Sequence, residues 1–160
     1  RADVGHGTME ALYLLPKLKP DEPYNMGWPI FEGSKRMRDH PLTENETLAP
    51  IFEYTHNGGR GIIGGYFLEN LDVYLVGDFM GNIRLLKRLD DSRWQEIYFQ
   101  EMDTSILSFG YETKTKSLFM AGWNETYTLN IAPELVGQLP TAIFCETKMP
   151  DGTLNNANCP

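Results

Sequence analysis

A glycine-rich segment ahead of an apolar run is the first feature of the sequence with a chemical interpretation. Residues Gly59–Gly64 read GRGIIG, which fits the G-x-G-x-x-G pattern of dinucleotide-binding loops. That chemistry needs a preceding strand and a following helix whose N-terminus receives the pyrophosphate. Here the glycines lead into Gly65-Tyr66-Phe67-Leu68, which is strand material. The segment His56–Gly61 is therefore predicted to be a turn that enters a strand, and Gly64-Gly65 to allow close approach of two backbones.

Charged side chains near this turn suggest binding chemistry. His56 and Arg60 flank the glycines and could meet an anionic ligand, or they lie in a solvated loop. Lys35, Arg36 and Arg38 form a short cationic run that either contacts an acidic partner or is solvated. No His/Cys spacing suggests zinc, and no G-x-S-x-G signature suggests acyl transfer.

Two further groups of residues are expected to be structural. Asp78 is predicted to brace a turn by accepting hydrogen bonds from backbone N–H groups. The three tryptophans are predicted to pack in the core or between sheets rather than to form a platform for a sugar; they are Trp28, Trp94 and Trp123.

Composition excludes several function classes. The 160 residues include 14 Lys plus Arg against 22 Asp plus Glu, which gives a net charge of −8. Nucleic acids and anionic membranes are bound by clustered Lys and Arg, so neither partner fits. The longest apolar stretches, such as Leu12–Leu15, are too short for a transmembrane helix. A hydrophobic content of 41% indicates a folded chain.

Three features favour an extracellular protein. Asn45-Glu46-Thr47 and Asn124-Glu125-Thr126 are acceptor sequences for N-glycosylation. Cys145 and Cys159 are the only cysteines and stand in a tail with little apolar content, where they form either a disulfide or two free thiols. The chain begins with Arg1 rather than Met, so we expect a removed targeting peptide or a longer gene product.

Short strands at regular spacing fill the middle of the sequence. Seven are predicted, separated by Gly, Asp, Asn or charged turn material: Ile62–Leu68, Asp72–Gly77, Asn82–Lys87, Trp94–Phe99, Ile106–Tyr111, Ser117–Ala121 and Thr126–Ile131. An eighth strand, Glu10–Leu15, precedes a Pro-rich connection and a long loop, Gly33–Pro50. No long segment has a helical apolar period. The pattern predicts an all-β antiparallel meander of the kind found in sandwiches, barrels and propellers.

Several blocks of the sequence match known motifs in order. The first blocks are Asp3-Val4-Gly5-His6 and Tyr24-Asn25-Met26-Gly27-Trp28-Pro29, which resemble the DVGQ and NYGWP motifs of the glucose/sorbosone dehydrogenase family. Later blocks resemble its AP…EY, GGYVYRG, GDF and SFGED stretches; they are Ala49–Tyr54, Gly64-Gly65-Tyr66, Val76–Phe79 and Leu107–Gly110. The secreted branch that resembles Hedgehog-interacting protein is the most similar, partly because of Trp94-Gln95-Glu96.

The resemblance implies a six-bladed β-propeller in which each blade is a four-stranded antiparallel sheet. A whole propeller of this kind needs more than twice the present length. Residues 1–132 are therefore expected to be the C-terminal portion, about two blades plus flanking loops, and residues 133–160 an irregular tail with the cysteines. Such a portion leaves open sheet edges, so we expect the remaining blades, from the same gene product or another chain, to be its partner.

For chemistry, the resemblance implies a site for pyrroloquinoline quinone and calcium, where catalytic members oxidise sugars with a general-base His upstream of the part present here. Asp3 and His6 fall where the family places calcium-adjacent and cofactor-adjacent groups. His6 could be a base or ligand, or an ordinary surface or core residue. Met80 and Ser105 stand where catalytic members carry the Lys and Arg that hold the cofactor's carboxylates.

Loss of those cations favours a secreted, glycosylated binding module that contacts an extracellular protein or sugar through the loops Gly33–Pro50 and His56–Gly61. The alternative is a quinone- and calcium-dependent sugar dehydrogenase whose upstream blades supply the base. A third interpretation is a structural glycoprotein that keeps the fold only as a scaffold.

Overall fold

A computed structural model describes residues 1–15, 23–90, 93–131, 147–148 and 154–155 of the chain. Within these residues the protein is all-β, built from antiparallel sheets with two short 3-10 helices, η1 (Glu44–Glu46) and η2 (His56–Gly58). No helix among them is long and apolar enough to cross a membrane.

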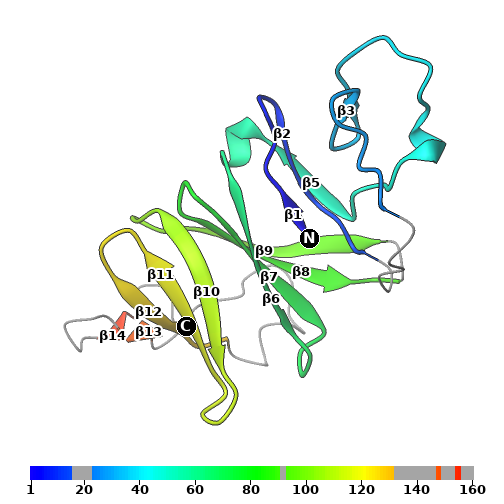
Figure 1. Cartoon of the computed structure of the whole chain (residues 1–160). Coiled ribbons are helices and arrows are strands. Elements are labelled where there is room, and N and C mark those ends of the chain that lie inside the picture. Colours follow the sequence, from blue (N-terminus) through cyan, green and yellow to red (C-terminus); the bar gives the residue numbers. More distant parts are fainter. Residues whose placement is uncertain (16–22, 91–92, 132–146, 149–153, 156–160) are drawn as a thin grey trace.

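A four-stranded antiparallel sheet forms the centre of the molecule (Figure 1). Its strands follow one another in space as in sequence: β6 (Ile62–Leu68), β7 (Val73–Asp78), β8 (Asn82–Arg88) and β9 (Trp94–Glu101). Neighbours of this kind need only short turns, which fits the Asp, Asn and Gly residues between the strands. The prediction of a meander is confirmed.

Two further sheets lie on opposite sides of the central one (Figure 1). On one side is a three-stranded sheet of β1 (Ala2–Asp3), β2 (Met9–Leu12) and β5 (Phe52–Thr55). On the other is a five-stranded sheet of β10 (Ile106–Glu112), β11 (Ser117–Gly122), β12 (Thr126–Leu129), β13 (Thr147–Lys148) and β14 (Leu154–Asn155).

The central sheet is buried on both faces because successive side chains of a strand point to opposite sides. Leu75 and Leu85 belong to the core shared with the five-stranded sheet. Their neighbours Val76 and Leu86 belong to a second core shared with the three-stranded sheet. Strand β7 therefore reads as a nearly continuous apolar run at Val73–Val76, and β8 places the adjacent Leu85 and Leu86 in the two different cores.

All seven strands predicted between residues 62 and 131 are present, with ends that shift by one or two residues. The eighth is shorter than predicted, Met9–Leu12. Sequence analysis missed β1, β5, the hairpin β3 (Phe31–Glu32) and β4 (Lys35–Arg36), and the strands β13 and β14 within the tail that it predicted to be irregular. Strands of two to four residues are too short to show a periodic signal. The glycine-rich turn leads from η2 into strand β6, as predicted, and no helix follows the glycines.

Close backbone approach at Gly65 is also confirmed. A Cβ built at this position would lie 1.6 Å from the carbonyl oxygen of Leu75 on the paired strand β7. Only a residue without a side chain fits there.

Candidate binding surface

The buried carboxylate of Asp78 fastens two turns to each other. Its side chain is 1% exposed. Oδ1 accepts the N–H groups of Arg60 (3.1 Å) and Met80 (2.7 Å), and Oδ2 accepts the N–H of Gly61 (3.1 Å). The Tyr54 hydroxyl donates a fourth hydrogen bond to Oδ2 at 2.6 Å. The predicted turn-bracing role is confirmed, and it joins turn 56–61 to turn 78–81.

Gly59 lets the first of these turns wrap around the carboxylate. Its φ of +150° lies where side chains are rare, and an added Cβ would lie 2.4 Å from Asp78 Oδ2. Burial, together with the hydrogen bond to Asp78, raises the pKa of Tyr54 above its ordinary value. The hydroxyl therefore remains a donor throughout the physiological range.

A second buried carboxylate, Glu10, holds the start of the same turn. Its Oε1 lies 2.8 Å from His56 Nε2, and its Oε2 accepts the N–H groups of Ile62 (2.9 Å) and Gly5 (3.3 Å). His56 follows β5 directly and is thus engaged with the paired strand β2 of the same sheet. His56 was predicted from sequence as a candidate ligand residue, and its observed contact with Glu10 braces the turn. No feature of the sequence indicated this contact, because Glu10 lies in an ordinary strand pattern.

Arg84 closes the network from strand β8. Its guanidinium pairs with Glu96 and donates to the carbonyl oxygen of Gly58 at 2.6 Å. The same group lies 4.5 Å from the ring centroids of Tyr54 and Phe99. Through its two terminal nitrogens, this cation holds turn 56–61 on the sheet.

A third buried carboxylate anchors the long loop. Glu32 Oε1 accepts three consecutive N–H groups, those of Gly7 (2.9 Å), Thr8 (2.7 Å) and Met9 (3.0 Å), and Oε2 accepts the Thr8 hydroxyl. Burial by itself would raise the pKa of Glu32. The hydrogen bonds to its carboxylate outweigh this effect and lower the pKa to about 2. Glu32 precedes the loop directly, so the loop begins from a fixed point.

Replacing Glu32 by Gln is expected to reduce the free energy of unfolding by about 2 kcal/mol near pH 6, since hydrogen bonds to a charged carboxylate become weaker bonds to a neutral amide. A lowered folded-state pKa stabilises the fold above the ordinary value of 4.5, and the contribution disappears as pH falls towards 2. Urea unfolding of both proteins from pH 6 to pH 2 measures this. A difference that does not shrink on acidification would contradict the assignment.

Other contacts hold the loop close to its base. The Ser34 N–H donates to Glu53 Oε2 at 2.7 Å, and the Ser34 hydroxyl bonds the other oxygen of the same carboxylate. Arg36 lies over the Phe31 ring at 4.5 Å and donates to the carbonyl oxygens of His40 and Leu42. Of the predicted cationic run, Arg36 is therefore structural.

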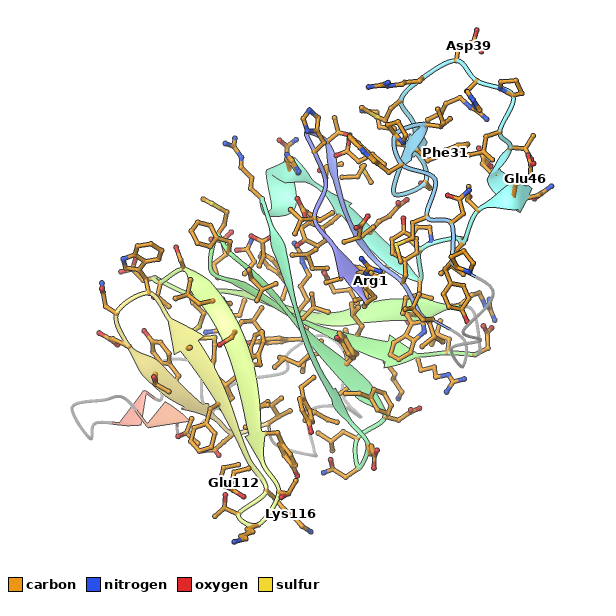
Figure 2. All side chains as sticks on the ribbon, in the orientation of Figure 1. Arg1, Phe31, Asp39, Glu46, Glu112 and Lys116 are labelled. Carbon is orange, nitrogen blue, oxygen red and sulfur yellow. The ribbon has the colours of Figure 1, made fainter. Side chains whose placement is uncertain are left out.

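The rest of the loop presents side chains to solvent. Lys35, Met37 and Arg38 are exposed, and the Met37 sulfur lies 3.9 Å from the Thr8 hydroxyl. The backbone of Thr8 also accepts the N–H of His56 at 3.1 Å, so the loop and turn 56–61 meet at one segment. Figure 2 shows Asp39 and Glu46 at the outer part of this loop, far from Glu112 and Lys116. We call Lys35, Met37 and Arg38 with turn 56–61 the loop surface.

The structure places the remaining candidate residues as follows. Arg60 is exposed on the loop surface. His6 is exposed beside Trp28, with ring centroids 5.5 Å apart. Asp3 is half-buried in β1 opposite Ala11. Asn45 and Asn124 are both exposed, as glycan acceptors must be, and Cys145 and Cys159 lie outside the described residues.

The expectation of packed tryptophans is wrong for two of the three. Trp28 is 56% exposed and Trp123 is 64% exposed, whereas Trp94 packs against the second core. Large aromatic residues are usually mostly buried, and nothing in the sequence pattern marks these two as exceptions.

The quinone implied by the resemblance does not fit the residues that form this end of the molecule. A cofactor with three carboxylates needs several free cations. Arg84 is already paired with Glu96 and bonded to the Gly58 carbonyl oxygen, and Met80 is exposed but uncharged. Of the arginines and lysines on turns 56–61 and 78–81, this leaves Arg60 to pair with a carboxylate. For a metal ion, the described residues contain no group of three or more His, Cys, Asp or Glu side chains suited to hold one.

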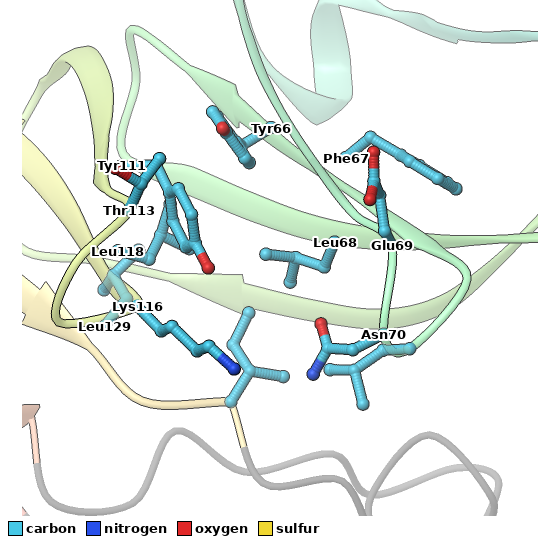
Figure 3. Close-up of a pocket in the computed structure, with 12 residues that line it drawn as sticks. Tyr66, Phe67, Leu68, Glu69, Asn70, Tyr111, Thr113, Lys116, Leu118 and Leu129 are labelled. Atoms are coloured by element: carbon cyan, nitrogen blue, oxygen red, sulfur yellow. The ribbon is translucent and has the colours of Figure 1, made fainter.

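A groove of about 690 Å³ lies at the other end of the sheets. Tyr66 and Tyr111 stack within it at 4.9 Å, and Lys116 and Asn70 reach over it from two turns (Figure 3). Its apolar wall, which includes Leu68 and Leu118, belongs to the first core. The groove shares no residue with the loop surface.

The described residues define a class: an all-β protein of antiparallel sheets with an anchored loop surface on which Lys35, Arg38 and Arg60 are exposed. The chain matches no family model and no solved structure.

Proposed function

We propose that the chain is a binding module of an extracellular glycoprotein, and that the loop surface binds an acidic partner. The observation that carries the proposal is the anchoring of exposed cations. Lys35 and Arg38 stand in a loop that directly follows Glu32, which is buried with four hydrogen bonds. A surface ordered before binding loses little entropy on association, and Met and Arg are enriched at protein interfaces.

Charge supports the same partner class. The whole chain carries a net charge of −8, whereas the exposed charged side chains of the loop surface, Lys35, Arg38 and Arg60, are cationic. Exposed cations on an otherwise acidic protein favour the approach of acidic partners to these residues.

We further propose that the three sheets are parts of blades of a sugar-dehydrogenase-like propeller that other blades complete. The first strands of successive sheets, β1, β6 and β10, contact each other in order, as the inner strands of neighbouring blades do. Turns 56–61, 78–81 and 122–125 lie at one end of the sheets (Figure 1), where such folds place binding loops.

Reversing two charges tests the binding surface. Lys35→Glu with Arg38→Glu is expected to weaken binding of a poly-glutamate peptide, measured by surface plasmon resonance on the immobilised protein, by roughly tenfold or more. Binding of the unchanged protein should also fall as salt rises from 50 to 150 mM, because exposed charges are screened.

Lys114→Glu is the matched control, since Lys114 is also an exposed cation but belongs to the β10–β11 turn at the opposite end. Equal weakening by both variants, or no peptide binding at all, would contradict the proposal. Binding of heparin without binding of poly-glutamate would reassign the surface to an acidic sugar.

A further inference from the structure

Two exposed aromatic rings meet beside a predicted glycosylation site. Trp123 is 64% exposed and Phe79 is 37% exposed. Their ring centroids are 6.3 Å apart and the rings are nearly perpendicular, at 83°. Exposed apolar area of this kind is a liability in water unless something covers it.

The backbone holds both rings in place. Trp123 and Asn124 form the tip of the β11–β12 hairpin, which the Gly122 N–H closes by donating to the carbonyl oxygen of Glu125 at 2.7 Å. The Trp123 N–H donates to the Thr104 hydroxyl at 3.3 Å, and the Phe79 N–H donates to the carbonyl oxygen of Gly61 at 2.8 Å. The backbone positions that carry the two rings are therefore fixed, and the rings contact each other edge to face; we call this pair the Trp123–Phe79 platform.

We propose that the first sugar of an N-linked glycan on Asn124 packs on the Trp123–Phe79 platform and stabilises the fold. This inference rests on the extracellular location in the proposed function. Asn124 is exposed and follows Trp123 directly, so the sugar is tethered next to the ring at high effective concentration. One face of an N-acetylglucosamine ring carries C–H groups, and burying it on the indole removes apolar area from water.

The attachment chemistry is ordinary group transfer. The oligosaccharide comes from a lipid diphosphate donor, whose bond between sugar C1 and phosphate oxygen breaks. A bond forms between C1 and the Asn124 side-chain nitrogen, which loses one proton, and the lipid diphosphate leaves.

The second acceptor provides an internal control. Asn45 is also exposed, but its neighbours in η1 are Glu44 and Glu46, which are exposed acids. A glycan there has no aromatic neighbour in the helix to pack on. It is expected to add bulk and solubility without stabilising the fold.

The test uses the protein secreted from eukaryotic cells, with the occupancy of both sites measured by mass spectrometry. We expect Asn124→Gln to lower the melting temperature by about 3 °C, and Asn45→Gln to change it by less than 1 °C. In a protein that already carries Trp123→Ala, Asn124→Gln should not lower the melting temperature further. In a protein that carries Phe79→Ala, Asn124→Gln should lower it by about half as much as in the unchanged protein. Trimming the glycan to its first sugar should preserve the stabilisation.

Three results would overturn the inference: an unoccupied Asn124, equal losses with and without Trp123, or equal losses for the two acceptor sites. They are distinguishable from failure of the proposed function. Absence of glycan from both sites removes support for secretion, whereas binding of poly-glutamate through Lys35 and Arg38 does not depend on the platform.

Discussion

Replacing Asp78 by Ala is expected to lower the free energy of unfolding by about 4 kcal/mol. The substitution leaves the N–H groups of Arg60, Gly61 and Met80 and the Tyr54 hydroxyl without their acceptor. Each buried donor that loses its partner costs about 1–3 kcal/mol, and water entering the space recovers part of the sum. Urea unfolding followed by far-UV circular dichroism measures the loss.

Two companion variants make the Asp78 result specific. Asp78→Asn keeps the shape but turns an amide towards the donors, so we expect a loss of about 2–3 kcal/mol. Asp39→Ala removes an exposed acid from the loop and should stay within about 0.5 kcal/mol of the unchanged protein. If Asp78→Ala behaves like Asp39→Ala, the carboxylate does not hold the two turns together.

Gly65→Ala is expected to cost about 3 kcal/mol or more, because the new methyl group would overlap the Leu75 carbonyl in the middle of the β6–β7 pair. Strand β6 must move away from β7, and such overpacking strains both cores that the central sheet shares. Thermal unfolding of the purified protein measures the effect.

Gly110→Ala is the matched control, since Gly110 also lies inside a strand but has no atom within 4 Å of an added Cβ. Alanine there should be neutral or slightly stabilising, because glycine is the more flexible residue in the unfolded chain. Similar losses at both positions would mean that strand propensity, and not backbone contact, limits residue 65.

The regular strands were predictable from local sequence and the contacts between distant segments were not. β-branched and aromatic residues bounded by turn residues predict β6 to β12, and the place of Asp78 before a turn predicts its bond with the nearby Met80 N–H. The other donors to Asp78, the donors to Glu32 and the Ile62 N–H that Glu10 accepts come from segments 17 or more residues away, so local sequence does not predict them. His56 was singled out by its place near glycines, but its contact with Glu10 depends on the pairing of β2 with β5.

The exposure of Trp28 and Trp123 also could not be predicted from the sequence. A residue type carries an average tendency to be buried, whereas Trp123 stands at a hairpin tip whose surroundings are set by turns 78–81 and 102–104. Neither sequence spacing nor composition contains that information.

The double-sided burial of β7 and β8 has a consequence for how such a protein can change over evolutionary time. Substitutions at Leu75, Val76, Leu85 and Leu86 must satisfy one hydrophobic core or the other, so few are tolerated. The turn between β6 and β7 carries no such constraint: Glu69, Asn70 and Asp72 are exposed there, and the turn is free to lengthen or exchange residues. New binding specificities can therefore arise in descendants by loop divergence, while the sheets that support the loops stay the same.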